Sequence, residues 1–185
     1  MDDRASFEIE ELRKRKDIFF RKSPNSPLSS SQKISFTGLK YFDYNPALAF
    51  EIELEPCLPE EIRIGTSSGD ERMYVRAGHL QFEISGKVQR LTALSREDED
   101  ELFVPFADAT SGTDTYVGGR YLEVSHSDNG RFRLDFNLAY NPYCAYSFIV
   151  VMSSPSRRES PRRSHTRGRA DICCGPLTRQ RESGA

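Results

Sequence analysis

The residues whose types suit chemistry gather between Leu102 and Tyr146, where polar side chains are mixed with glycines and aromatics. This mixture is typical of a polar site walled by apolar side chains, on the loops and strand ends where β scaffolds usually carry sites. The pattern predicts a pocket for a small polar or anionic molecule. The candidate ligand-binding residues are Asp108, Thr110, Ser111, Tyr116, Arg120, Asp135, Asn137, Tyr140 and Asn141.

The first part of this stretch, Asp108–Thr113, has the sequence DATSGT. Its short hydroxyl side chains and its glycine could hold an anionic or polar ligand group through hydroxyl and backbone N–H donors. The alternative is a turn in which the same groups bond to one another. Arg120 follows a pair of glycines, and its planar guanidinium could clamp a carboxylate or phosphate. It could instead pair with Asp108 or Asp135 inside the protein.

Later in the stretch, Asp135 and Asn137 lie two residues apart on one expected strand, so both side chains face the same side of the sheet. In an open sandwich with an apolar core that side is exposed, whereas in a barrel the inner face could be the polar one. Asn141 precedes a proline, which favours extended or turn conformations and places Tyr140 and Cys144 at the rim of the sheet.

Cys144 is a weak candidate for a catalytic nucleophile, which makes a Cys-dependent hydrolase one alternative function. Such a thiol needs a neighbouring base, for which the sequence offers His79 and His126; a buried structural thiol is the simpler interpretation. The histidines, including His165, lack the spacing of metal ligands, and no GxGxxG or GxxxxGK[ST] motif is present. We therefore expect no metal and no cofactor.

These residues need a scaffold, and the sequence predicts one made mainly of strands. An amphipathic helix is expected from Asp2 to about Arg21, followed by a Pro/Ser-rich surface connection at 23–32. From Ala49 onward, apolar and polar residues alternate with the period of two that half-buried strands show. The expected strands begin at Ala49 and then lie at 61–66, 71–76, 79–84, 87–93, 102–106, 119–125, 131–137 and 146–152.

Short gaps separate most of these strands, which permits only antiparallel hairpins. The clearest turn is Asp128-Asn129-Gly130, because asparagine and glycine tolerate positive φ. Ala77-Gly78 and Ser85-Gly86 are also expected to separate strands, and the charge run REDEDE at 96–101 is expected to be a solvated connection. The fold class is therefore mainly β: an antiparallel open barrel or sandwich of about nine strands with an N-terminal α-helix.

Composition and charge limit the partners. The 185 residues, 37% of them hydrophobic, fit one domain with one core. No apolar run approaches the ~18 residues that span a bilayer and the N-terminus is charged, so we expect a cytoplasmic protein without membrane contact. The four cysteines form no CxxC pair, which indicates reduced thiols. Residues 153–185 carry a net charge of +5, which leaves −7 on residues 1–152 and argues against nucleic acid as a partner.

Four segments carry a family resemblance: FTGLKYF (36–42), TSSGDERMYVRAGHLQF (66–82), FADATSGTDTYVGGRYLEV (106–124) and LDFNLAYNPYCAYS (134–147). With them the chain resembles the bacterial and archaeal family known as domain of unknown function 1684 (DUF1684), over nearly all of residues 22–151. The resemblance implies a fold. It implies no activity, since none is assigned in the family's name.

After Val151 the chain becomes arginine-rich, with few apolar residues and no periodicity. One interpretation is a disordered basic tail that contacts nucleic acid or anionic membrane. The family resemblance implies another, because the family continues here with a proline pair and Glu-Asn. Reading the codons one base later can convert SSPSRRESPRR into such a segment. The tail would then be a frameshift product, disordered and without a selected function.

We accordingly expect three parts: a helix at 1–22 packed on the domain, an antiparallel β domain at 23–152 and a disordered basic tail at 153–185. The leading functional hypothesis is a protein, enzyme or not, that binds a small polar or anionic ligand in a pocket at the rim of the β domain. The rival is a structural or protein-interaction module, which predicts no enclosed pocket and a contiguous exposed apolar patch.

Overall fold

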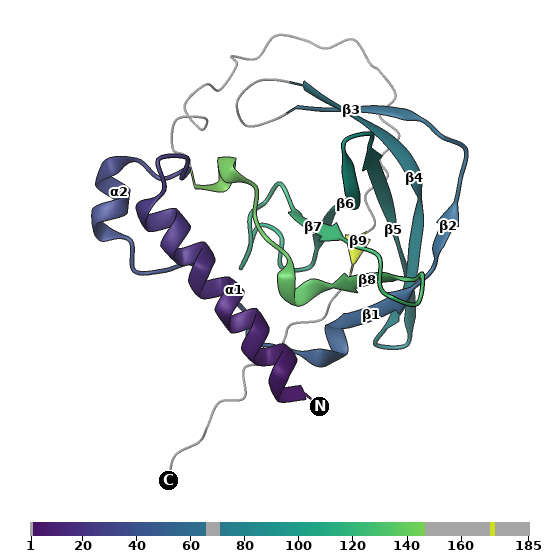
Figure 1. Ribbon diagram of the computed structural model, residues 1–185, viewed down its shortest axis with the longest axis horizontal. Coiled ribbons are helices and arrows are strands. Elements are labelled where there is room, and N and C mark those ends of the chain that lie inside the picture. Colours follow the sequence, from purple (N-terminus) through teal and green to yellow (C-terminus); the bar gives the residue numbers. More distant parts are fainter. Residues whose placement is uncertain (1, 66–70, 147–170, 173–185) are drawn as a thin grey trace.

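The computed structural model describes residues 2–65, 71–146 and 171–172. It contains one long helix, α1 (Asp2–Lys22), one short helix, α2 (Ser30–Ser35), and strands in antiparallel sheets. The expected mainly β class with an N-terminal helix is therefore confirmed. Over the described part of the chain the sheets do not close into a barrel. Figure 1 shows α1 lying across the outside of the strands.

The larger sheet has the order β2–β4–β5–β6–β7, with β3 also paired to β4, while β1 and β8 form a second pair. These strands are β1 (Ala49–Ile52), β2 (Leu54–Pro56), β3 (Glu61–Gly65), β4 (Glu71–Ile84), β5 (Lys87–Arg96), β6 (Glu99–Asp108), β7 (Arg120–Val124) and β8 (Phe132–Asp135). All of these pairs are antiparallel. A short β9 (Asp171–Ile172) lies parallel to the end of β6.

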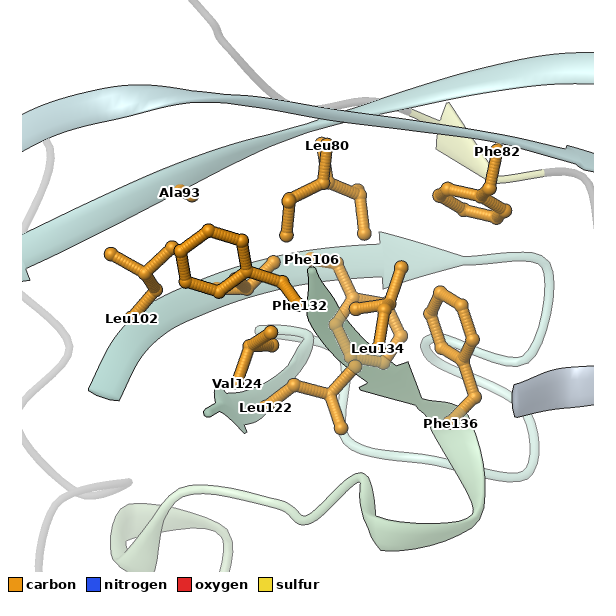
Figure 2. Packing of buried hydrophobic residues seen from close by; sticks show 12 residues of the cluster. Leu80, Phe82, Ala93, Leu102, Phe106, Leu122, Val124, Phe132, Leu134 and Phe136 are labelled. Atoms are coloured by element: carbon orange, nitrogen blue, oxygen red, sulfur yellow. The ribbon is translucent and has the colours of Figure 1, made fainter. Parts of the chain in front are cut away.

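The core lies on the inner faces of the strands, because apolar residues recur there at every second position. On β6, Leu102, Val104 and Phe106 are buried, and Leu122 and Val124 on the neighbouring β7 face the same side. Figure 2 shows these side chains meeting others from β4 and β8. Each buried leucine or phenylalanine stabilises the fold by about 1.5–3 kcal/mol. The cluster consists of Leu80, Phe82, Leu91, Ala93, Leu102, Val104, Phe106, Leu122, Val124, Phe132, Leu134 and Phe136.

The predicted break between strands at Ala77-Gly78 is wrong. The two strands expected at 71–76 and 79–84 form one continuous strand, β4, with an irregularity in its pairing with β5 between Arg76 and Gly78. Gly78 is needed for close packing against β2, since a Cβ atom there would lie 2.4 Å from the carbonyl oxygen of Glu55. A glycine inside a strand pattern can mark such a close backbone approach rather than a turn.

The charge run at 96–101 is a tight hairpin and not only a connection. Arg96 pairs with Glu99 in the β5–β6 ladder, so the last three residues of the run belong to β6. The Arg96 guanidinium contacts Asp98 at 2.6 Å and Glu99 at 2.7 Å. These ion pairs offset the repulsion among the acidic side chains, which is why so charged a segment can turn sharply.

Strand β8 is shorter than the expected 131–137. It ends at Asp135, whose carboxylate accepts a hydrogen bond from the backbone N–H of Asn137 at 3.0 Å and starts a 3-10 helix, η2 (Phe136–Leu138). Aspartate commonly competes with the sheet ladder in this way. The strand expected at 146–152 lies outside the described residues except for Tyr146, which ends another 3-10 helix, η3 (Tyr143–Ala145).

The Pro/Ser-rich connection at 23–32 runs into α2, which begins with a capping box. The Ser29 side chain accepts a hydrogen bond from the Gln32 backbone, and the Gln32 side chain accepts one from the Ser29 backbone. The prediction of a disordered tail falls on 153–185, of which only the two residues of β9 are described. In the described ranges, no helix is long and apolar enough to cross a bilayer.

Helix α1 is attached to the β domain by aromatic and cationic contacts. Phe20 is fully buried against Phe36, Tyr143 and Tyr146, with ring centroids 4.9 Å from Tyr146. On both sides of Phe20, cationic side chains of the helix lie over aromatic rings of the domain. Each such contact stabilises the fold by about 0.5–1 kcal/mol, or more when it is partly desolvated. These pairs are Arg13 over Tyr41, Lys16 over Tyr140 and Arg21 over Phe36.

Candidate functional site

The buried ion pair Arg120–Asp108 continues the inner face of β6 and β7. Arg120 lies directly opposite Phe106 in the ladder, so its side chain points to the same face as that core residue. Asp108 follows Phe106 by two positions and points the same way. The Arg120 Nη2 and Asp108 Oδ2 atoms are 2.5 Å apart, and the side chains are only 11% and 4% exposed. Of the two partners expected for Arg120, the structure selects Asp108.

The 108–115 loop is an internally bonded turn that holds Asp108. The second carboxylate oxygen, Oδ1, accepts hydrogen bonds from the Thr110 backbone at 2.9 Å and from its hydroxyl at 2.5 Å. The Ser111 hydroxyl accepts one from the Asp108 backbone at 3.1 Å, and the Thr110 and Thr115 hydroxyls lie 2.9 Å apart. The hydroxyls of Thr110 and Ser111 thus support Asp108, as the turn alternative predicts.

The guanidinium of Arg120 lies over two aromatic rings and retains an unused donor. Its central carbon lies 5.1 Å from the Phe106 ring centroid and 5.7 Å from that of Phe42. Its Nε is buried without a hydrogen-bond partner among the described residues, as are those of Arg13 and Arg76. A buried unsatisfied donor costs about 1–3 kcal/mol. The Nε–H of Arg120 is therefore a donor whose hydrogen-bonding capacity the described residues leave unused.

Tyr116 and Asn141 meet through a loop contact next to Cys144. The Asn141 side-chain oxygen accepts a hydrogen bond from the Tyr116 backbone at 3.4 Å, and the Cys144 sulfur lies 3.7 Å from the Tyr116 hydroxyl. The bond to Cys144 raises the pKa of Tyr116. Asn141 also bonds to the Tyr146 hydroxyl, while burial raises the pKa of Tyr146.

Cys144 therefore has a phenol as its neighbour, and its thiol donates to the Tyr116 oxygen, which is too weak a base to activate a nucleophile at neutral pH. The two histidines considered as bases make contacts elsewhere. The His126 ring lies against that of Phe132, with centroids 4.1 Å apart, and His79 pairs across the sheet with Thr92. Among the described residues, neither His79 nor His126 is therefore paired with Cys144.

Asp135 and Asn137 belong to a third network. Asp135 is 2% exposed and pairs with Arg133 at 3.1 Å, and its other oxygen accepts a hydrogen bond from the Asn137 side chain at 2.8 Å. Asn137 also exchanges two hydrogen bonds with the backbone of Asn45, at 2.8 and 2.9 Å. This network attaches the 42–45 segment, which carries Phe42, to the end of β8.

Tyr140 is held at the edge of β7. Its hydroxyl donates to Glu123 at 2.6 Å, and its backbone exchanges two hydrogen bonds with Tyr121. Burial, followed by the bond to Glu123 and its negative charge, strongly raises the pKa of Tyr140. The ammonium of Lys16 lies 4.3 Å from the ring centroid, and burial lowers the pKa of this lysine.

The nine predicted residues therefore form four hydrogen-bonded groups on neighbouring segments. The segment that carries Phe42 and Asn45 links the Arg120 group to the Asp135 group. Tyr140 instead contacts Tyr121 and Glu123, which alternate with the core residues of β7 and therefore lie on the face opposite Arg120. Sequence reasoning missed Phe42, Asn45 and Lys16, because each is brought in from a distant segment. Thr115 was also missed, although it lies in the 108–115 loop and its hydroxyl is of the same type as those of the predicted residues there.

Among the open hollows of the described surface, one of about 480 Å³ and one of about 500 Å³ are lined by none of the nine residues. The first lies along α1 and the second beside the ends of β3, β4 and β5. Among the described residues, no group of three or more histidine, cysteine, aspartate and glutamate side chains could hold a metal ion.

Comparisons with known proteins place this chain in a family. The family model described as "Protein of unknown function (DUF1684)" matches residues 34–157. A solved structure, the solution NMR structure of an uncharacterized protein of Haloarcula marismortui, is 35% identical, with 80% of this chain and 85% of that chain covered and a TM-score of 0.62. No curated protein matches the chain.

Proposed function

The chain belongs to the DUF1684 family of proteins of unknown function, and we propose that it binds a small anionic molecule at Arg120. A carboxylate or phosphate is the ligand class that a guanidinium edge recognises. The supporting observation is the unpaired, buried Nε of a guanidinium that contacts Asp108 through one oxygen only. The site is at the rim of the β domain, and the unpaired thiols of Cys57 and Cys144 suit a cytoplasmic location.

A ligand would reach this edge by displacing Phe42, whose ring centroid lies 5.7 Å from the guanidinium carbon. Residues 36–45 belong to no helix or strand, so the Phe42 side chain can turn away with little loss of regular structure. The hydrogen bond between Asn45 and Asn137 then holds the end of this segment in place while Phe42 moves. Binding replaces a cation–ring contact by a charge-assisted hydrogen bond, which is the stronger interaction.

The test follows arginine side-chain N–H signals of the uniformly ¹⁵N-labelled full chain during titration with inorganic phosphate and then with citrate. The Nε–H signal of Arg120, assigned through bonds from its backbone, should shift in a saturable way with at least one anion. The signal of Arg133, which is also paired with an aspartate, is the matched internal control and should remain nearly unchanged.

Arg120→Lys keeps the positive charge and removes the planar guanidinium with its fixed donors. It should therefore abolish saturable binding while leaving the spectrum of the folded protein intact. Equal, non-saturating shifts of Arg120 and Arg133 with both anions would refute the proposal. The titration of the unmodified chain decides the question even where the Arg120→Lys variant does not fold.

A further inference from the structure

Helix α1 has an outward face that the β domain leaves uncovered. Its inward residues, Ile9 and Phe20, are 4% and 1% exposed, whereas Phe7 is 62% exposed and Ile18 55% exposed. Phe7 and Ile18 are about three helical turns apart, so they lie on one face. An open hollow runs along this side of the helix, lined by Phe7, Glu8, Glu11, Leu12 and Arg15.

The charges on α1 are divided along its length. Glu8, Glu10 and Glu11 lie in the first half, where Arg4 is the one cation, and the second half begins with four consecutive cations at Arg13–Lys16, followed by Asp17. Glu11 and Lys14 lie on the outward face between Phe7 and Ile18, with side chains 40% and 64% exposed. A second copy of the same helix, reversed in direction, presents cations where the first presents carboxylates.

We propose that two copies of this chain associate through an antiparallel pair of α1 helices. A two-fold axis between Leu12 and Arg13 places Phe7 of one copy opposite Ile18 of the other. The same axis places Glu11 opposite Lys14, and every contact occurs twice, as a self-complementary interface requires.

The spacing of all four residues fits this one axis. Phe7 and Ile18 lie equally far from it, and so do Glu11 and Lys14. Ile18 of the second copy then reaches the hollow that Phe7 and Leu12 line. Arg15 comes within reach of Glu8 and Glu11 of the second copy, since adjacent residues are only about 1.5 Å apart along the helix axis.

A parallel pairing of the same face is disfavoured, because it would place Glu11 against Glu11 and Lys14 against Lys14. The present pairs within the helix, Glu11–Lys14 at 2.8 Å and Arg4–Glu8 at 3.0 Å, are exposed and can be shared between the copies. One helix pair is a small interface, below the size of stable dimers, so the association should be reversible and dependent on concentration.

Sedimentation equilibrium of the full chain between about 5 and 500 µM tests the dimer. The unmodified protein should show a concentration-dependent rise from monomer to dimer mass. Phe7→Asp should weaken the dimer at least tenfold. The control, Leu58→Asp, changes a leucine that is 89% exposed outside α1 and should have no effect on the dissociation constant. Circular dichroism should show both variants folded.

Two charge reversals identify the pairing itself. Glu11→Lys places two cations opposite each other and Lys14→Glu two anions, so each variant alone should dimerise at least fivefold more weakly. An equimolar mixture of these two variants should recover the dimer, and so should the double variant in which both charges are exchanged.

A chain that remains monomeric at 500 µM overturns the proposal, as does a Phe7→Asp variant that dimerises like the unmodified protein. A mixture of the two reversed variants that stays monomeric while the unmodified protein dimerises overturns the antiparallel α1 pairing, since another surface must then carry the dimer.

Discussion

Gly119 lies against Phe106 so closely that a Cβ atom on the glycine would be 2.4 Å from the phenylalanine carbonyl oxygen. Gly119 also has a φ of +92°, a conformation that side chains strongly disfavour. The close approach lets the chain enter β7 directly beside β6. It thereby places Arg120 opposite Phe106 and within reach of Asp108.

Gly119→Ala should therefore destabilise the protein by more than about 2 kcal/mol, since backbone strain of about 1–2 kcal/mol adds to a backbone clash that cannot relax. Urea denaturation followed by circular dichroism measures the loss. The matched control is Gly130→Ala in the Asp128-Asn129-Gly130 turn, where φ is +77° and nothing lies within 4 Å of the added Cβ. The control should lose only the stability that corresponds to the backbone strain. Equal losses of stability in both variants would contradict this role of Gly119.

Asp108→Asn should destabilise the protein by about 3–5 kcal/mol, because it leaves the buried guanidinium of Arg120 without its counter-ion. Removing both charges, with Asp108→Asn and Arg120→Met together, should recover much of this loss. Urea denaturation of the two single variants and the double variant gives the coupling energy. Glu53→Gln, which breaks the exposed pair with Arg131, should change stability by less than about 0.5 kcal/mol. Additive losses in the double variant would show that the two side chains do not stabilise each other.

Alkaline pH should destabilise the protein through two tyrosines, Tyr140 and Tyr41, that are only partly exposed. Burial and Glu123 raise the pKa of Tyr140 in the folded state, and burial and Asp17 do the same for Tyr41. A raised tyrosine pKa contributes stability that is fully present below the unfolded pKa of about 10 and is lost as pH rises above it. Stability measured by urea denaturation should fall steeply above about pH 10.

Tyr140→Phe should lower stability at pH 7 by about 1 kcal/mol, through loss of the hydrogen bond to Glu123, and should make the alkaline fall shallower. Tyrosine absorbance near 295 nm, followed with pH, shows whether ionisation accompanies unfolding. Tyr143→Phe removes a hydroxyl from a side chain that is 44% exposed and should leave the alkaline fall unchanged. Identical pH profiles for Tyr140→Phe and the unmodified chain would exclude Tyr140 as a contributor.

Much of the fold could be predicted from local patterns. The span of α1 was predicted to within one residue of its end, because its amphipathic stripe and its acidic first turn are local. The turns at Ser85-Gly86 and Asp128-Asn129-Gly130 were also predicted, and Ser85, Gly86 and Gly130 adopt the positive φ that such turns require. Alternation of apolar and polar residues fixed which side chains enter the core, because the strand repeat of two is a property of the backbone.

Only the tertiary structure decided what those side chains meet. The sequence left Arg120 with Asp108, Asp135 or a ligand as partners, and the register of β6 on β7 selected Asp108. It gave no sign that Phe42 would cover Arg120 or that Asn45 would bond to Asn137. Local periodicity follows from backbone geometry over a few residues. A contact between residues that are far apart in the chain depends on how whole strands and loops pack, and no short stretch of sequence encodes it.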